Sequence, residues 1–321
     1  MAHGADRSIP AWPAFLAVGL AAWAACLSGC RALPPGGGSP APAREWRGEP
    51  VAEYARCCGL KPTVSVDLGN GVSMEFVLVP AGTFQMGSPA GEKDRKNNEQ
   101  QHEVVISRPF YMSRYAVTQK QYNGVTGEKA GYFTGNDNPV ESVSWNDAMT
   151  FCRKVSEMRK AAGRPDVALQ LPTEAQWEFA CRAGTTAPYY GRLEEILWCM
   201  ANSDYAPHPV GGRQPNAFGL YDMLGNVAQW CRDAHTEQYE TLDRTDPLNA
   251  EGAQRMTRGG SWNYAADLCR AACRDWNDPD DRLTNLGFRV VWEWSMVWDT
   301  EATEKERAHR GDCGVGRETA N

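Results

Sequence analysis

The sequence predicts a loop-rich globular fold in which short helices and strands pack around buried aromatic side chains. The chain of 321 residues contains 12 Trp, together with 31 Gly and 20 Pro, and a helical bundle would not use residues in this way. Hydrophobic residues make up 42% and charged residues 23%, which is typical of an ordinary globular protein. The net charge of −7 leaves no basic surplus to neutralise phosphates, which argues against a nucleic-acid binder.

The first thirty residues have the pattern of an export signal. Arg7 precedes an apolar run from Ala11 to Leu27, which ends in the tetrapeptide LSGC at 27–30. The run is roughly 17 residues long, which is marginal for a helix that must cross a bilayer. The ending resembles a bacterial lipobox, and this resemblance implies removal of residues 1–29, lipid on Cys30 and a location in the cell envelope. A plain secretory signal or an uncleaved anchor is the alternative.

The segments on either side of the main body are predicted to lie outside the folded domain, which is expected over residues 71–295. Residues 30–50 contain the lipidated cysteine and the stretch PPGGGSPAPA, a composition that favours a flexible tether. Residues 299–321 are highly charged and contain few large apolar side chains, which predicts a mobile tail.

Export also predicts disulfide bonds, because the compartments outside the cytoplasm are oxidising. Of the 11 cysteines, Cys26 is lost with the signal and Cys30 is acylated, so an odd number of thiols remains. No Cys-x-x-Cys pair or Cys/His spacing indicates a zinc site. The remaining cysteines are Cys57, Cys58, Cys152, Cys181, Cys199, Cys231, Cys269, Cys273 and Cys313.

Strands are predicted at both ends of the body. The stretch MEFVLVPAGTFQMGS at 74–88 is strand-like and is broken at Pro80 and Gly82. The stretch 104–118 has the same character and leads into a helix, and the polar residues 88–103 before it indicate a surface loop. The last ordered piece is expected to be a strand over residues 286–294.

Three helix starts are indicated by the capping-box spacing, in which a Ser or Thr is followed three residues later by a residue that can bond back to the backbone. The three pairs are Thr118 with Gln121, Ser144 with Asp147, and Thr173 with Gln176. The second and third of these helices are predicted to be amphipathic. The residues expected on their buried faces are Ala148, Cys152 and Val155, then Trp177, Ala180 and Cys181.

Six segments, in this order, resemble the sulfatase-modifying-factor family, whose best-known members are the formylglycine-generating enzymes. The segments are FVLVPAGTFQMGS (76–88), NPVESVSWNDAMTFC (138–152), LPTEAQWEFACRAG (171–184), PNAFGLYDMLGNVAQW (215–230), RGGSWN (258–263) and RDWNDPDDRLTNLGFRVV (274–291). The resemblance implies a single α+β domain related to C-type lectins and low in regular secondary structure. The family contains both oxidases and binding modules without chemistry, so function has to be decided at the site.

The oxidases of this family hold copper(I) with two cysteines, and soft thiolates suit that ion. The first cysteine follows the GGS motif by three residues, and the second lies five residues further on. In this chain GGS ends at Ser261, which places Tyr264 at the first position and Cys269 at the second. Counting back from NLGFR at 285–289 instead places Ala266 at the second position. Both registers leave the cysteine pair incomplete.

Cys269 and Cys273 are the candidates for a substitute pair. Their segment is expected to be a strand, where residues four apart share a face but lie about 13 Å apart, so joint ligation of one copper ion would need a bend. The alternative is that both are core thiols or form disulfides. The plausible disulfide partners are Cys152, Cys181 and Cys231.

Ser261 is a further catalytic candidate. No His or acid at a recognisable spacing supports a serine nucleophile. The GGS motif more often marks a tight backbone turn beside a strand.

The resemblance also implies a calcium site in the turn GLYDMLGNVAQW at 219–230, built from side-chain oxygens and backbone carbonyls. The matching ligands are Asp222, Gly225, Val227 and Gln229. Gln229 stands where the family usually has Glu, which removes a charge, and Asp222 stands where Asn is common, which can restore it. The alternative is a hydrogen-bonded turn made by the same residues.

The stretch 262–285 is unusually rich in Trp, Tyr, Asn, Asp and Arg, which give rigid contacts and adaptable hydrogen bonds in binding loops. This region resembles the variable segment of proteins of the same fold that retroelements diversify, some of which are surface lipoproteins. The alternative is the ordinary Asn- and Asp-rich core loop of the family. The residues expected on a ligand or substrate surface are Trp262, Tyr264, Asp267, Trp276 and Asp278.

Two functions therefore stay open for an exported protein that attaches to a membrane through lipid and binds a protein or peptide but no nucleic acid. One is oxidation of a cysteine in a protein substrate, of the formylglycine type, with copper(I) and with Cys269, Cys273 or Ser261 in the site. The other is non-catalytic ligand binding at the cell surface. The incomplete cysteine pair favours the second function, and the family resemblance favours the first.

Overall fold

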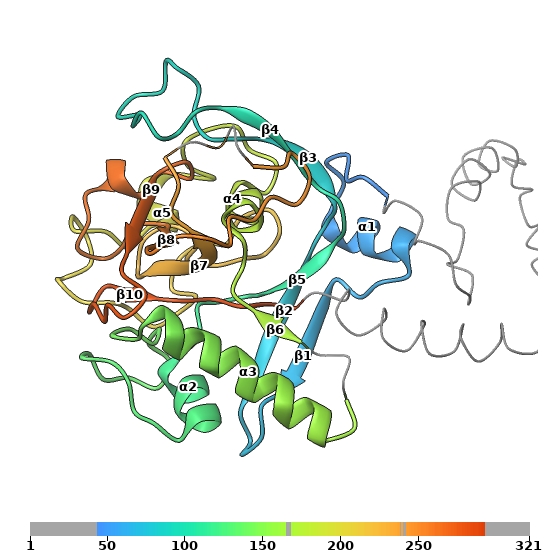
Figure 1. Ribbon diagram of the computed structural model, residues 1–321, viewed down its shortest axis with the longest axis vertical. Helices are drawn as coiled ribbons and strands as arrows, with labels where there is room; N and C mark the ends of the chain where they lie inside the picture. The colour runs from blue at the N-terminus through green and yellow to red at the C-terminus, as the bar shows by residue number, and fades with distance from the viewer. Residues whose placement is uncertain (1–43, 165–167, 238, 240–241, 293–321) are drawn as a thin grey trace, which may run out of the picture. The chain divides into compact units, whose positions relative to one another are not determined.

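The computed structural model describes residues 44–164, 168–237, 239 and 242–292 (Figure 1). The predicted signal, the lipidated Cys30 and the predicted tail at 299–321 lie outside these residues. Within the described part, none of the helices has the length and apolar character that a membrane span requires.

A five-stranded antiparallel sheet forms one side of the body, in the order β1-β2-β5-β11-β6 (Figure 1). Its strands are β1 (Thr63–Asp67), β2 (Ser73–Val79), β5 (Phe110–Ser113), β6 (Leu169–Gln170) and β11 (Val291–Trp292). The chain breaks at Pro80 after β2, as predicted, because proline has no N–H to donate to a sheet. The packed body also begins earlier than residue 71, since β1 pairs along its whole length with β2.

A second sheet, in the order β10-β7-β8-β9, carries the segment around the GGS motif. Its strands are β7 (Ala228–Ala234), β8 (Arg255–Arg258), β9 (Arg274–Asn277) and β10 (Leu286–Gly287). The β10–β7 pair is parallel and the other two pairs are antiparallel. A separate hairpin of β3 (Gly82–Met86) and β4 (His102–Ile106) carries the loop 87–101.

All three predicted capping boxes are confirmed, with reciprocal side-chain and backbone hydrogen bonds at Thr118, Ser144 and Thr173. The helices are α1 (Val51–Cys58), α2 (Gln119–Thr126), α3 (Trp145–Ala161), α4 (Glu174–Arg182) and α5 (Leu193–Ile196), with a 3-10 turn η2 (Ala266–Cys269). Helix α4 lies in the interior, where it contacts β3, β7 and β8 (Figure 1). The mixture of helices and strands confirms the predicted α+β class.

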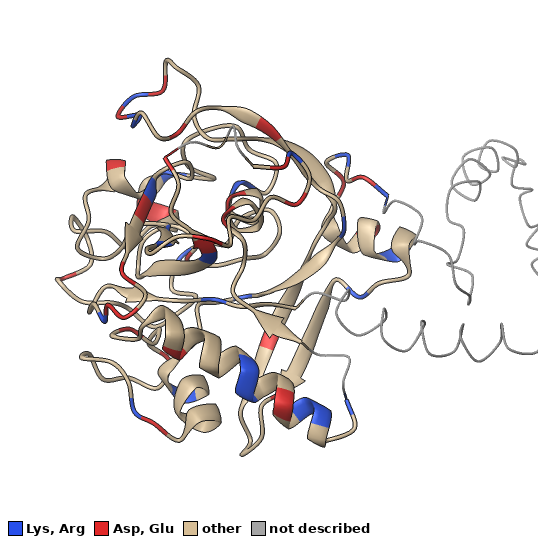
Figure 2. Cartoon of the chain, viewed as in Figure 1, with Lys and Arg blue, Asp and Glu red and all other residues tan. Residues whose placement is uncertain are grey.

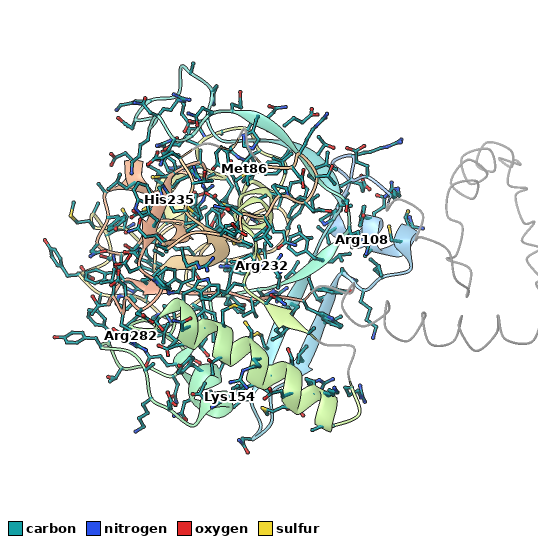
Figure 3. The ribbon with its side chains drawn as sticks, in the orientation of Figure 1. Met86, Arg108, Lys154, Arg232, His235 and Arg282 are labelled. Carbon is teal, nitrogen blue, oxygen red and sulfur yellow. The ribbon has the colours of Figure 1, made fainter. Side chains whose placement is uncertain are left out.

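Polar contacts at several points along helix α3 hold it to the body, two of them made by Lys154 and Arg282 (Figure 3). Lys154 donates to the carbonyl oxygen of Thr126, and Arg282 pairs with Asp147 at the start of the helix. Its buried face consists of apolar residues that include the predicted Ala148, Cys152 and Val155. The predicted amphipathic character of this helix is therefore confirmed.

The core contains two groups of buried apolar side chains, one centred on the five-stranded sheet and one around α4. Trp230 belongs to the first group and Trp177 to the second, and both are fully buried. Trp145, the first residue of α3, is only partly buried and donates its indole N–H to the carbonyl oxygen of Cys231.

Two predictions about the ends of the body need correction. The predicted tether reaches residue 50, but Trp46 already donates to the carbonyl oxygen of Ala81 and packs edge-on against Phe218. The predicted strand at 286–294 is interrupted, since β10 and β11 belong to different sheets. The chain changes sheets at Arg289, whose guanidinium turns inward and donates to the carbonyl oxygens of Ser113 and Tyr221.

Ion pairs occupy the interior between α4 and the second sheet, where acidic and basic residues come together (Figure 2). Arg274 binds both carboxylate oxygens of Glu174, at 2.7 and 2.9 Å. Arg258 bridges Glu174 and Glu178, and Arg182 also pairs with Glu178. Burial alone would raise the pKa of Glu174, but Arg274 and Arg258 outweigh this effect and lower it. The Glu174 carboxylate therefore remains charged inside the protein.

We expect Arg274→Leu to lower the free energy of unfolding by about 3–5 kcal/mol, because it leaves the buried Glu174 carboxylate without its two-pronged partner. Urea unfolding at neutral pH measures this loss. Arg153→Leu is the control, since Arg153 pairs with Glu157 on the solvent side of α3, and its effect should stay within about 0.5 kcal/mol. Equal losses in the two variants would contradict a structural role for the buried pairs.

Candidate functional site

The GGS motif forms a tight turn directly after β8, as the sequence predicts. Gly259 and Gly260 both have positive φ, at +98° and +65°. A Cβ at Gly259 would lie 2.8 Å from the carbonyl oxygen of Met223, and one at Gly260 would lie 2.5 Å from the sulfur of Cys269. Only glycine fits both the conformation and the space. The turn thus brings bare backbone to the surface of a cavity.

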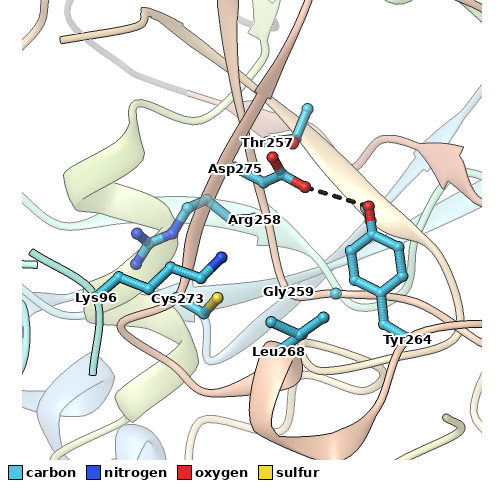
Figure 4. Close-up of a pocket in the computed structure, with 10 residues that line it drawn as sticks. Lys96, Thr257, Arg258, Gly259, Tyr264, Leu268, Cys273 and Asp275 are labelled. Carbon is cyan, nitrogen blue, oxygen red and sulfur yellow. Dashed lines mark hydrogen bonds between the residues drawn. The ribbon is translucent and has the colours of Figure 1, made fainter. Parts of the chain in front are cut away.

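This cavity has a volume of about 120 Å³ and lies beside β8, β9 and the 3-10 turn (Figure 4). Its wall includes Lys96, Arg258, Gly260, Tyr264, Cys273 and Asp275. Tyr264 and Cys273 were predicted site residues, whereas Lys96, Arg258 and Asp275 were not. The sequence holds one signal that points to Arg258 and Asp275, namely their position beside the GGS motif and beside Cys273.

Tyr264 stands at the position that one register assigns to the first catalytic cysteine. Its hydroxyl donates to a carboxylate oxygen of Asp275 at 3.2 Å (Figure 4). Burial, and then the neighbouring Asp275 carboxylate, raise the pKa of Tyr264 to about 12. The residue is therefore a neutral hydrogen-bonding group, and it offers no thiolate to a metal.

The two candidate cysteines occupy different surroundings. Cys269 is fully buried behind Gly260 and is not part of the cavity wall, whereas Cys273 faces the cavity. Burial raises the pKa of both thiols, and for Cys273 the Lys96 ammonium opposes this effect. Neither environment favours a thiolate at neutral pH, which a soft-metal site requires.

The segment between these cysteines is not the strand that the sequence predicts. Cys269 ends the 3-10 turn η2, and the N–H of Cys273 donates to the carbonyl oxygen of Arg270 in a second tight turn before β9. The chain bends here because Arg270 is drawn into an ion-pair cluster. No disulfide joins the cysteines of the described part, so the predicted bonds to Cys152, Cys181 or Cys231 are absent there.

Ser261 is buried and bound by amides. Its hydroxyl donates to the side-chain oxygen of Asn263 at 2.8 Å and accepts from the side-chain nitrogen of Asn285 at 3.1 Å. Among its described partners there is no base that would take its proton. The side chain instead stabilises the turn.

The residues predicted for a ligand surface do not form one patch. Trp262 is buried against Phe133, and Trp276 stacks on His235, whose position Figure 3 shows. Asp267 and Asp278 are exposed, but only Tyr264 of the five lines the cavity. Tyrosine and tryptophan in this stretch thus serve mainly to pack the loops.

Arg270 fixes the loop 87–101 over the cavity. Its guanidinium binds Glu92 at 2.6 Å, Glu99 at 2.8 Å and the carbonyl oxygen of Asp94. Because Lys96 lies between these partners in the loop, the cluster sets its position at the cavity wall. The predicted surface loop is therefore held in place, by a residue that sequence reasoning did not single out.

The predicted calcium ligands lie together in the turn before β7. The side-chain oxygen of Gln229 already accepts hydrogen bonds from Trp177 and Arg289, at 2.8 and 2.6 Å. One carboxylate oxygen of Asp222 accepts from the N–H of Gly211, whereas the other is buried and has no partner among the described residues.

The geometry therefore fits a cation at Asp222 better than at Gln229. Gly225 and Val227 could contribute only their carbonyl oxygens, and calcium accepts such ligands. In the described part, no group of three His, Cys, Asp or Glu side chains is arranged to hold a metal ion. We propose that a calcium ion bound in this turn would have Asp222 as its charged ligand.

Comparison with known proteins gives consistent matches over the body of the chain. The family described as Sulfatase-modifying factor enzyme 1-like domain matches residues 69–294. The chain is 27% identical over 269 residues to the chaperone protein LppX of Paenibacillus barcinonensis, with 68% of this chain and 90% of the relative covered. It is 30% identical over 290 residues to the formylglycine-generating enzyme of Streptomyces coelicolor, with 67% and 88% covered.

Among solved structures, Treponema denticola variable protein 1 is similar in fold and in sequence. The TM-score is 0.65 and the identity 28%, over 72% of this chain and 98% of that protein. These relatives include one that carries the name of an enzyme and one that is named for its variability.

The pH dependence of stability in Asp222→Asn tests whether this carboxyl, the proposed calcium ligand, is buried as described. Burial raises the pKa of Asp222 to about 6, from an ordinary 3.8, so the folded chain holds a proton between these values that the unfolded chain has lost. With calcium chelated, the stability of the wild type relative to the variant should fall by up to about 3 kcal/mol as the pH rises from 4 to 7. Thermal unfolding over this range measures the difference.

Added calcium should raise the unfolding midpoint of the wild type at neutral pH, because it binds only the folded state, and should leave the variant unchanged. Calcium that stabilises both proteins equally, or neither, would contradict a cation site at Asp222.

Proposed function

Because the chain belongs to the sulfatase-modifying factor enzyme 1-like family, with its C-type-lectin-like α+β fold, we propose that it is an exported, non-catalytic member of that family. Its function is to bind a peptide segment of a partner protein at the cavity beside the GGS turn. The observation that carries this proposal is that Tyr264, bonded to Asp275, stands where one register expects the first cysteine of the pair.

The chemistry of the site supports binding over oxidation. Two thiolates on one ion need two sulfurs that reach the same space, and only Cys273 lines the cavity. Cys269 is fully buried against Gly260 and is not part of the cavity wall. Tyr264 supplies a neutral hydroxyl at the same wall, which is suited to hold a ligand by hydrogen bonds.

Oxidation of a cysteine in a protein substrate is the second candidate. Similarity to the Streptomyces coelicolor enzyme and the presence of Cys273 in the cavity favour it. In that case copper(I) would be the cofactor, and Cys273 would be its ligand from this chain. The raised pKa of the thiol weighs against this candidate.

Export and lipid attachment form part of the proposal. The support is the LSGC tetrapeptide after an apolar run and the Pro- and Gly-rich stretch that follows it. A lipid on Cys30 would hold the binding cavity at a membrane surface, at the end of a tether that extends to about residue 43.

We expect the full chain to capture peptides from a display library and to leave them chemically unchanged. The captured peptides and a Cys-x-Pro-x-Arg peptide are incubated with the protein, copper and oxygen, and their masses are measured by mass spectrometry. The Streptomyces coelicolor enzyme in the same assay is the positive control. Conversion of cysteine to formylglycine that disappears in Cys269→Ala or Cys273→Ala would overturn the non-catalytic proposal, and absence of any capture would overturn binding.

Cys30→Ala should abolish the incorporation of labelled fatty acid into the protein made in a bacterial host. Cys26→Ala lies four residues away in the same segment and should leave incorporation intact, since it is removed with the signal. Lipid that persists in the Cys30 variant would show that the anchor is elsewhere or does not exist.

A further inference from the structure

We propose that the cavity beside the GGS turn is a recognition pocket for a carboxylate of the bound peptide, either an acidic side chain or the chain terminus. This inference rests on the proposed function, because it names the group that the binding site selects. It comes from an unsatisfied buried donor, an unpaired ammonium group and the size of the cavity.

The unsatisfied donor is the Nε–H of Arg258. The two terminal nitrogens of this guanidinium are occupied by Glu174, Glu178 and the carbonyl oxygen of Ala271. The Nε atom has no partner among the described residues, although the side chain is fully buried and forms part of the cavity wall. A buried donor without an acceptor costs about 1–3 kcal/mol, and a ligand oxygen in the cavity would recover that cost.

A second donor comes from the loop above the cavity. Lys96 lines the cavity and takes part in none of the ion pairs found among the described residues, whereas Lys93 in the same loop pairs with Asp94. The Arg270 cluster holds this loop in place, so the backbone at Lys96 is kept beside the cavity. An ammonium and an arginine N–H on one small space favour a negatively charged acceptor.

The carboxylate of Asp275 also lies in the cavity wall, but it bonds to its neighbours and not to Lys96 or Arg258. Asp275 is turned toward Tyr264 and toward its neighbour's backbone, since its two oxygens accept from the Tyr264 hydroxyl and from the N–H of Trp276. Thr257 accepts from the side chain of Asn277, which leaves its hydroxyl proton free to donate. The groups still available to a ligand are therefore the donors Lys96, Arg258 and Thr257, together with the lone pairs that remain on the Asp275 carboxylate.

The cavity is large enough for a carboxylate and the carbon atoms next to it. Its volume of about 120 Å³ admits a carboxylate with one or two methylene groups. Leu268 provides an apolar surface for those methylene groups. An Asn or Gln side chain has a similar shape, but its NH2 group would face donors, so the pocket should reject it.

Nuclear magnetic resonance titration of the full chain in detergent tests the assignment. The probes are N-acetyl-aspartate α-amide for a side-chain carboxylate, N-acetyl-glycine for a terminal carboxylate and N-acetyl-asparagine amide as the neutral counterpart. We expect a saturable shift of the Arg258 Nε–H signal with a carboxylate probe, and binding of the amide at least about tenfold weaker. The two carboxylate probes distinguish the side chain from the terminus as the source.

Lys96→Gln should weaken binding of the carboxylate probe by about tenfold. The unfolding midpoint should not change, because Lys96 is exposed. Lys93→Gln is the matched control in the same loop and should bind as the wild type does. If the acid and the amide bind equally, or if neither moves the Arg258 signal at tens of millimolar, the carboxylate pocket is wrong.

The outcome can be separated from that of the proposed function. Peptides captured from a display library that tolerate Asp→Asn and Glu→Gln would leave peptide binding intact and overturn the pocket. A shift of Arg258 with the carboxylate probes, without capture of any peptide, would support the pocket and overturn peptide binding.

Discussion

Two glutamates on one turn of helix, Glu174 and Glu178, connect the parts of the protein that make the site. They receive Arg258 from β8, Arg274 from β9 and Arg182 from their own helix, all in the interior. A buried ion pair gains little net stability over a hydrophobic contact, but loss of one partner is costly. The cluster therefore fixes one arrangement of α4 against β8 and β9, which contribute to the cavity wall.

A second ionic cluster, around Arg270, fixes the loop 87–101 at the edge of the cavity in the same way. Arg270 joins the segment between Cys269 and Cys273 to the loop 87–101 through Glu92 and Glu99. Burial would raise the pKa of Glu99, but its bonds to Arg270 and Ser88 outweigh it and lower the pKa. In a fold with few long helices or strands, such charged clusters hold the loops together, as extended backbone pairing does in other folds. Two donors of the cavity wall, the Arg258 Nε–H and the Lys96 ammonium, take no part in these clusters.

The same scaffold can host oxidation or binding because the chemistry depends on few side chains. Tyr264 follows the GGS turn, donates to Asp275 and is half-buried against the core. What changes is the group offered to the cavity, from a soft anion to a neutral hydroxyl. The buried surroundings of Cys269 and Cys273 add to this, because low polarity favours the thiol over the thiolate.

Much of the local structure could be predicted from the sequence. The capping boxes at Thr118, Ser144 and Thr173, the break at Pro80 and the GGS turn are set by bonds and torsions within a few residues, so pattern reasoning could place them. Ordered motifs were sufficient for the family and for the fold class. The folded structure places Lys96 and Cys273 on the wall of one cavity, buries Cys269 against Gly260, and leaves the Nε–H of Arg258 without a partner among the described residues. These facts depend on contacts between residues that are far apart in the chain, and their spacing in sequence does not encode such contacts.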